Sequence, residues 1–170
     1  MKASIASTLL ILPIAAFSAS NSPDSDFYKL AAEGGISEVE LGTLAEDKAT
    51  SQDVKDFAAM MVKDHGAADD KLKSLAASKG VDLPTSASIG EIATKAKLNV
   101  LSGDTFDKSY IKSQLKAHHE AIALFRKEAS TGQDPDAKAF ASATLPTLKK
   151  HMQAIRRVAA AAGITSKKHG

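Results

Sequence analysis

The sequence predicts an all-α protein, a four-helix bundle in which a long crossover carrying a short helix connects the second and third long helices. Four long segments repeat apolar residues at helical spacing, i, i+3, i+4 and i+7. Hydrophobic residues make up 44% of the chain, which contains no Trp and no Cys. This composition favours helices that pack through small residues over a β-sandwich. The crossover is predicted from the length of one connection, between residues 81 and 103.

The first helix is predicted over residues 24–48. Ser22 is a candidate N-cap and Pro23 suits the first helical position. The pair Gly34-Gly35 costs the helix about 1 kcal/mol per Gly relative to Ala, so we expect a neighbouring helix to approach closely there. A start after Gly35 is an open alternative. The inward-facing residues are Phe27, Leu30, Ala31, Gly34, Glu38, Leu41 and Ala45.

The second helix is predicted over residues 51–79, with Gly80 as a left-handed stop. Its inward-facing residues are Val54, Phe57, Ala58, Met61, His65, Ala68, Leu72 and Leu75. Because only a few residues separate it from the first helix, the two are expected to be antiparallel neighbours.

The segment 81–103 begins with a helix break at Leu83-Pro84. Ser88 and Glu91 then form a capping box, which predicts a short helix through about Leu101. A connection this long predicts a crossover to the opposite end of the bundle. The second and third long helices are then parallel.

The third long helix is predicted over residues 105–130 and the fourth over residues 135–162. Asp104 and Asp107 begin the third, and Asp134-Pro135-Asp136 caps the fourth. Gly132 is expected to end the third helix and Gly163 the fourth. The inward-facing residues are Phe106, Tyr110, Ile111, Leu115, His118, Ile122, Phe125 and Ala129 in the third, and Ala137, Phe140, Ala141, Thr144, Leu148, His151, Ile155, Val158 and Ala162 in the fourth.

Four ionisable residues interrupt these apolar stripes: Glu38, His65, His118 and His151. Each lies near the midpoint of its helix, so they are expected to form one polar layer at the waist of the bundle. One carboxylate and three imidazoles suit one divalent metal ion such as Zn, Cu or Fe, with Thr144 and Asp69 as supporting partners. A metal-free Glu-His network that fixes helix register is the competing interpretation.

The two ends of the chain are predicted to lie outside the bundle domain, residues 22–163. Lys2, an apolar stretch over residues 8–17 and small residues at 16–20 are typical of a signal peptide, assigned to residues 1–20. The apolar stretch is too short for a stable membrane anchor. The mature protein is therefore expected to be periplasmic or secreted. Residues 164–170 are expected to form a disordered tail.

The charge pattern and the absence of Cys exclude several classes of function. The net charge is +2, with acidic and basic residues interspersed, so no basic face for nucleic acid is expected. The absence of Cys excludes disulfides, thiolate metal sites and cysteine catalysis.

The chain also resembles a known family, the exported bacterial domain of unknown function 4142 family, which is classed as ferritin-like. The similar segments are Gly35-Ile36-Ser37-Glu38-Val39-Glu40-Leu41-Gly42, Val54-Lys55-Asp56-Phe57-Ala58, Met61-Val62-Lys63-Asp64-His65, Phe106-Asp107 to Tyr110, His118 to Leu124-Phe125, and Leu145-Pro146 to Leu148 and His151. The resemblance implies a ferritin-like fold and export, but no activity. Glu38, Asp64, His65, His118 and His151 match the ionisable positions of its motifs.

The ligand pattern of ferritin-like di-iron proteins is missing. Those proteins use Glu-x-x-His pairs, but Val62, Leu115 and Leu148 stand three residues before the histidines. No di-iron centre is expected, and ferroxidase or iron storage is not inferred from the superfamily.

These observations favour a non-enzymatic exported protein that binds one divalent metal ion or small ligand at its waist. The alternative is an envelope-stress or surface-interaction module with a purely structural Glu/His layer and an envelope protein partner or a homodimer. A mononuclear metal oxidoreductase or hydrolase ranks third, because the sequence outlines no substrate pocket.

Overall fold

The computed structural model describes residues 24–164, and within that range it contains five helices and no strands. The predicted all-α class is therefore confirmed. The helices are α1 (Ser25–Lys48), α2 (Gln52–Lys79), α3 (Ile89–Asn99), α4 (Gly103–Thr131) and α5 (Pro135–Ala161). The predicted signal peptide and residues 165–170 of the predicted tail lie outside the described residues.

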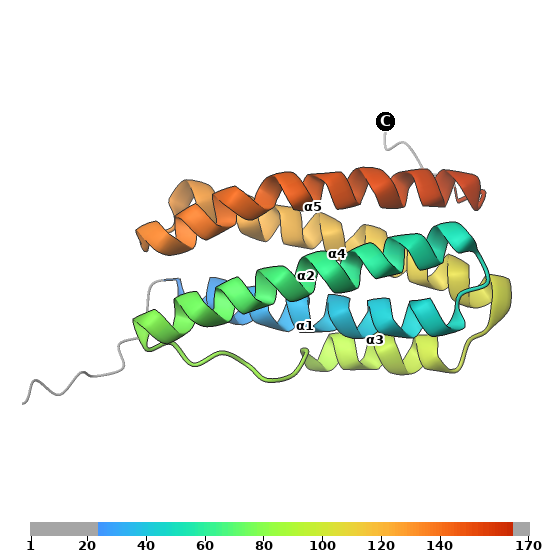
Figure 1. Ribbon diagram of the computed structural model, residues 1–170, viewed down its shortest axis with the longest axis horizontal. Coiled ribbons are helices and arrows are strands. Elements are labelled where there is room, and N and C mark those ends of the chain that lie inside the picture. Colours follow the sequence, from blue (N-terminus) through green and yellow to red (C-terminus); the bar gives the residue numbers. More distant parts are fainter. Residues whose placement is uncertain (1–23, 165–170) are drawn as a thin grey trace, which may run out of the picture.

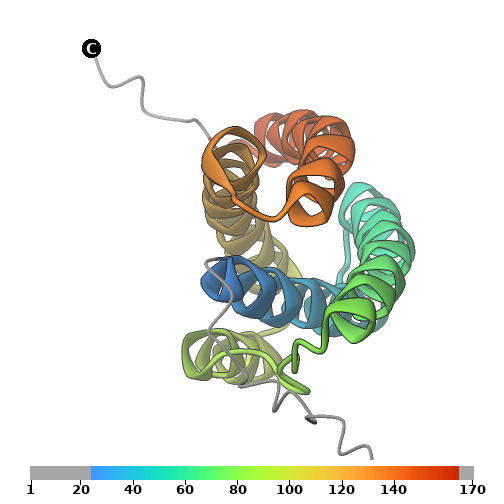
Figure 2. The same cartoon turned by 90° about the vertical axis from the view of Figure 1, so that its left-hand side faces the viewer.

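Four of the helices are long and lie alongside one another, and the short α3 lies outside them against α1 (Figures 1 and 2). Figure 1 shows that α2 and α4 run in one direction and α1 and α5 in the other. The most extensive pairs are α1 with α2 and α4 with α5. No helix within residues 24–164 has both the length and the apolar character that crossing a membrane requires.

Local sequence signals set most of the helix ends. Gly80 ends α2 with φ 66°, a left-handed conformation that suits Gly. Ser88 and Glu91 form the capping box of α3, in which the Glu91 carboxylate accepts from the Ser88 N–H at 3.0 Å. The Asp134 carboxylate caps α5 by accepting from the Asp136 N–H at 2.9 Å.

Two aspartates lie near the start of one helix but accept hydrogen bonds at the start of another. Asp107 does not cap its own helix. Its carboxylate accepts from the N–H groups of Thr50 at 3.1 Å and Ser51 at 2.8 Å, and so caps the start of α2 from α4. The Asp24 carboxylate accepts from the Gln133 and Asp134 N–H groups before α5, and α1 begins one residue later than predicted, at Ser25.

The core consists of two apolar clusters. The first includes Phe57, Met61, Tyr110 and Ile155, and the second includes Phe27, Leu72, Phe125 and Leu148. On each long helix the polar residue predicted for the waist lies in sequence between members of the two clusters. Ile164, which the sequence analysis assigns to the tail, packs against the first cluster and donates its N–H to the Ala159 carbonyl at 2.8 Å.

Candidate metal centre

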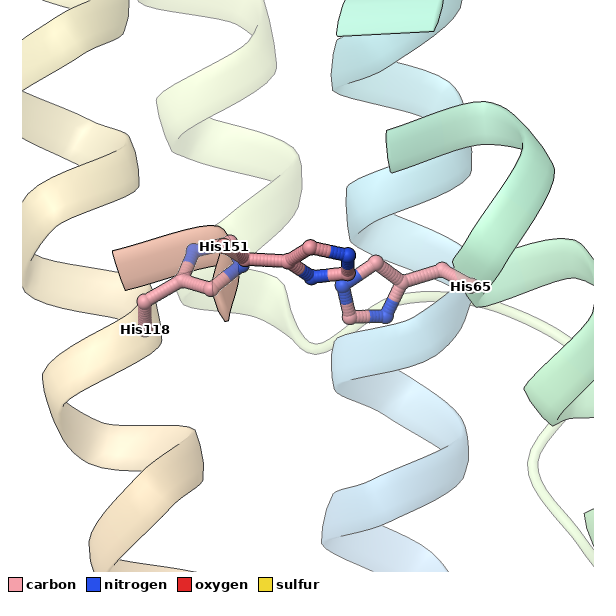
Figure 3. A group of neighbouring side chains, drawn as sticks. All are labelled: His65, His118 and His151. Atoms are coloured by element: carbon pink, nitrogen blue, oxygen red, sulfur yellow. The ribbon is translucent and has the colours of Figure 1, made fainter. Parts of the chain in front are cut away.

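Three histidine rings from three helices meet inside the protein and point toward one another (Figure 3). The ring centroids of His65 and His118 are 5.8 Å apart, and each lies 5.4 Å from the centroid of His151. One ring nitrogen from each residue lies within 4.8 Å of those from the other two. The side chains of His118 and His151 are each 1% exposed. Helices α2, α4 and α5 therefore contribute one imidazole each to a single cluster.

The protonation of His118 follows from its hydrogen bond. Its Nδ1 lies 3.0 Å from the carbonyl oxygen of Gln114, one turn earlier in α4. Because a carbonyl oxygen only accepts, Nδ1 carries the proton and the lone pair is on Nε2. This Nε2 is buried and has no hydrogen-bond partner among the described residues.

The ring of His151 is fixed by a carboxylate. Its Nε2 lies 3.0 Å from Oδ2 of Asp64, a residue of α2 that adjoins His65 in the chain. The Nε2–H donates to that oxygen, and the lone pair is therefore on Nδ1, which is buried without a hydrogen-bond partner within residues 24–164. A histidine that donates its second ring N–H to a carboxylate or a carbonyl is the usual form of a metal ligand.

The cluster thus has three buried ring nitrogens that lack a protein partner among the residues described: Nε2 of His65, Nε2 of His118 and Nδ1 of His151. A buried polar atom without a partner costs about 1–3 kcal/mol. Three such atoms lie on adjacent rings, and a shared metal ion would satisfy all of them.

Burial keeps these histidines neutral. Burial, followed by the neighbouring histidines, lowers the pKa of His65 to about 3. Burial also lowers the pKa of His118 to about 4, and it lowers the pKa of His151 against the opposing influence of Asp64. At neutral pH the rings therefore carry free lone pairs, the form that binds metal ions without first losing a proton.

Glu38 lies in the same layer but outside the group of three nitrogens. Its side chain is 8% exposed, and its Oε1 lies 3.8 Å from Nδ1 of His118, the nitrogen that donates to Gln114. Burial raises the pKa of Glu38 to about 7, against the opposing influence of the Gln114 side chain. The structure therefore brings three of the four sequence-predicted residues into one cluster and places the fourth beside it.

The partners that orient the histidines differ from the expected ones. The Thr144 hydroxyl donates to the Phe140 carbonyl at 2.8 Å, and Asp69 has no hydrogen bond to a histidine within the described chain. Asp64 and Gln114 have the roles expected of Thr144 and Asp69. The family motif includes Asp64, whereas the contact of Gln114 comes from its backbone and leaves no side-chain signal in the sequence.

Two cavities adjoin the polar layer. The larger, of about 330 Å³, is lined by residues of all five helices and includes Glu38, His65 and Asp69. The smaller, of about 250 Å³, is lined by Asp64, His65 and His151 among others. His65 therefore lies between the two cavities.

Comparisons with known proteins agree with the fold. The family model described as Domain of unknown function (DUF4142) matches residues 12–158. A DUF305 protein from Streptomyces coelicolor, described as a candidate secreted protein, has a crystal structure with a TM-score of 0.73 at 13% identity, covering 89% of this chain and 100% of that one. A DUF305 fragment from Deinococcus radiodurans has a TM-score of 0.73 at 12% identity, covering 82% and 97%. No curated protein matches the chain. At these identities the likeness shows the fold alone.

Proposed function

Because the chain belongs to the DUF4142 family, whose description assigns no activity, we propose a function from its geometry: the protein binds one divalent transition-metal ion through His65, His118 and His151. The observation that carries this proposal is the set of three buried ring nitrogens without partners on adjacent rings. Zn, Cu and Fe are the candidate ions, because neutral imidazole is a good ligand for each.

The dimensions of the cluster support the proposal. Three nitrogens at about 2.0–2.1 Å from a tetrahedral zinc ion are about 3.4 Å apart. The histidine nitrogens lie within 4.8 Å of one another, so small side-chain adjustments close the site. Two of the rings are already held by hydrogen bonds, to the Gln114 carbonyl and the Asp64 carboxylate. Glu38 adds a carboxylate beside His118 and is the protein's own candidate for a fourth ligand.

We also propose a fold family and a cellular location for the protein that carries this site. The four long helices form a ferritin-like bundle with a crossover, as the parallel direction of α2 and α4 and the position of α3 between them in the chain support (Figure 1). The protein is exported and is periplasmic or secreted, as the apolar stretch of residues 8–17 supports. N-terminal sequencing of the protein from its source cell checks this, since an intact Met1 contradicts it.

A metal titration of the full chain tests the site. Chelator-stripped protein is titrated with Zn²⁺, Cu²⁺ and Fe²⁺, and we expect near-stoichiometric binding of at least one of them. His118→Ala should lower that affinity by more than the roughly 10–100-fold that removal of an outer hydrogen-bond partner causes. His119→Ala is the matched control, because it removes an exposed histidine from the next position of the same helix.

The titration also distinguishes the competing interpretation. A Glu/His layer that is only structural predicts no stoichiometric binding by the stripped protein and no rise in Tm on adding metal. Equal affinity of His118→Ala and His119→Ala would contradict the proposed ligands. If His118→Ala loses its helical circular dichroism, His65→Gln gives the same test at the least buried of the three rings.

A further inference from the structure

The larger cavity has an unusual combination of walls and charges. Much of its lining is apolar, including Leu41, Leu72, Leu124, Phe125, Phe140 and Leu148. Four acidic residues also line it. Glu91 accepts from the Ser88 N–H and Glu120 pairs with Lys116, which leaves Glu38 and Asp69. The cavity volume of about 330 Å³ is at the lower end of the range of small-ligand sites, about 300–1,000 Å³. The lining therefore suits a small molecule with an apolar body and a polar group that interacts with carboxylates.

Glu38 supplies the first acidic group of this cavity. The residue is 6% exposed, and its Oε2 is buried without a hydrogen-bond partner among residues 24–164. No Lys or Arg within the described chain lies within ion-pair distance of it. Although the Gln114 side chain favours the charged form of Glu38, its buried Oε2 has no partner, so a ligand that supplied a cation or a hydrogen-bond donor would be favoured there.

Asp69 supplies the second acidic group of the cavity. Its carboxylate lies against the backbone of Gly35, where an added Cβ would come within 1.9 Å of Oδ1. Gly35 precedes Glu38 by three residues, so the Asp69 carboxylate of α2 lies against α1 about one helical turn from Glu38. Lys73, one turn along α2 from Asp69, is exposed and makes no ion pair with it in the part of the chain described.

The cationic residue in the cavity lining is already paired. Lys116 makes an ion pair with Glu120 at 3.0 Å, and both side chains are well exposed, at 76% and 60%. Leu30, at 49% exposed, marks the same outer part of the lining. The rim is therefore neutralised and open to solvent, whereas the buried Glu38 and the half-buried Asp69 make no ion pair among the described residues.

We propose that this cavity binds an organic ammonium ion with an apolar body, whose charged nitrogen lies between Glu38 and Asp69 and whose hydrocarbon or aromatic part packs against Leu124, Phe125 and Phe140. The two phenylalanine rings, with centroids 5.9 Å apart, offer faces to which cations and methylene groups bind favourably. The inference goes beyond metal binding, because apart from Glu38 it uses side chains that the proposed metal site does not use.

Calorimetric titration of the full chain with hexylammonium chloride tests the inference. The titration is run with chelator present, at pH about 8, where an alkylamine, like a lysine side chain, stays protonated. Hexan-1-ol and hexanoate are the comparison probes, with the same hydrocarbon and a neutral or negative head. We expect saturable binding of hexylammonium at one site and binding of the other two probes that is weaker by about tenfold or more.

Three variants locate the site. Asp69→Asn and Glu38→Gln should each weaken hexylammonium binding by about tenfold or more, since each removes a charge placed beside the cation in the proposed complex. Glu120→Gln removes the same charge from the exposed rim and should change the affinity by less than about fivefold. Asp69→Asn should leave metal affinity at the three histidines unchanged, which separates this inference from the proposed metal site.

Three results would overturn the proposal: no saturable binding of hexylammonium, equal binding of hexan-1-ol, or equal effects of Asp69→Asn, Glu38→Gln and Glu120→Gln. Equal binding of the alcohol would show a cavity that selects only for apolar surface. Each variant is first checked for native helical circular dichroism. If Glu38→Gln fails this check, Asp69→Asn against Glu120→Gln decides the question.

Discussion

Asp64 and His65 are adjacent in the chain, yet the Asp64 carboxylate contacts His151 of α5. This contact fixes the ring of His151 with its proton on Nε2 and its lone pair on Nδ1. It also makes the imidazole a better ligand, because an anionic partner stabilises the positive charge that the ring acquires on binding a metal. Asp64 is thus a positioning residue of the proposed site.

Asp64→Asn should weaken metal binding by about 10–100-fold while leaving the protein folded. The amide oxygen still accepts the hydrogen bond, so the variant tests the charge rather than the contact. Metal titration by calorimetry measures the loss, with Asp70→Asn, an exposed position on the same helix, as the control. An unchanged affinity in Asp64→Asn would show that the charge of Asp64 does not strengthen metal binding by His151.

The sequence predicted the histidines themselves because each replaces an apolar residue in a helical stripe. Periodicity could not predict which ring nitrogen carries the proton, since that depends on partners one turn away or on another helix. The Gln114 carbonyl and the Asp64 carboxylate are such partners. The position of Glu38 beside the cluster depends on side-chain conformation, which a helical stripe does not specify.

At the scale of helices, α1 packs tightly against the backbone of α2 at Gly42. A Cβ added there would come within 2.8 Å of Val62 Cγ2 and 3.0 Å of the Ala58 carbonyl oxygen. The sequence predicts a close approach at Gly34-Gly35. Gly35 does lie against the Asp69 carboxylate, whereas Gly34 has nothing within 4 Å of its added Cβ. The backbone of α1 therefore contacts α2 at Gly42, two turns beyond the predicted pair.

This difference predicts opposite effects of the same substitution. Gly34→Ala should stabilise the protein by about 1 kcal/mol through helix propensity alone. Gly42→Ala gains the same propensity but forces α1 and α2 apart, and it should destabilise the protein by about 1–3 kcal/mol. Urea unfolding of the two variants measures both values. A stabilised Gly42→Ala would contradict the tight packing described for this pair.

Helix ends could be predicted to within a few residues where their signals are local, as at Gly80, Ser88 and Asp134-Pro135. Asp107 could not be assigned correctly from sequence, because it looks like a cap for its own helix. It caps α2 instead, through contacts with Thr50 and Ser51 that exist only when α2 and α4 are packed.

At the scale of the whole molecule, the long connection correctly predicted that α2 and α4 run in the same direction (Figure 1). The larger cavity could not be predicted, because five helices contribute side chains to it and the shape depends on how they pack. Its acidic residues Glu38 and Asp69 were visible in the sequence, but the absence of an ion-pair partner is a property of the folded molecule.

The stability of the metal-free protein should fall as pH drops below about 6.5. The pKa of His65 is lowered from 6.5 to about 3 and that of His118 to about 4. The unfolded chain therefore binds protons in this window that the folded chain does not. Carboxyls act in the opposite direction. Burial raises the pKa of Glu38 from 4.5 to about 7 and that of Asp69 from 3.8 to about 6, and it also raises the pKa of Glu128, so the folded state holds their protons. These carboxyls offset much of the effect of the three histidines, so we expect the fall to be shallow.

Replacing Glu38 separates the effect of its carboxyl on the free energy of unfolding from the effect of the histidines. Glu38→Gln should make the fall of stability steeper between pH 7 and 4.5, by up to about 1.4 kcal/mol per pH unit. Urea unfolding in chelator at several pH values measures the slope. The exposed variant His119→Gln should reproduce the slope of the unmodified protein. If the stability of Glu38→Gln also stays flat to pH 4.5, the rings are protonated in the folded state.

The three rings of the cluster come from α2, α4 and α5, helices that are separated in the chain and assemble only when the protein is complete. A nascent or unfolded polypeptide therefore offers no chelating geometry, only isolated imidazoles. Under the proposed function, the ion is acquired after the last helix has docked. The metal that the protein carries then reflects the ions available where folding finishes, not those where the polypeptide was made.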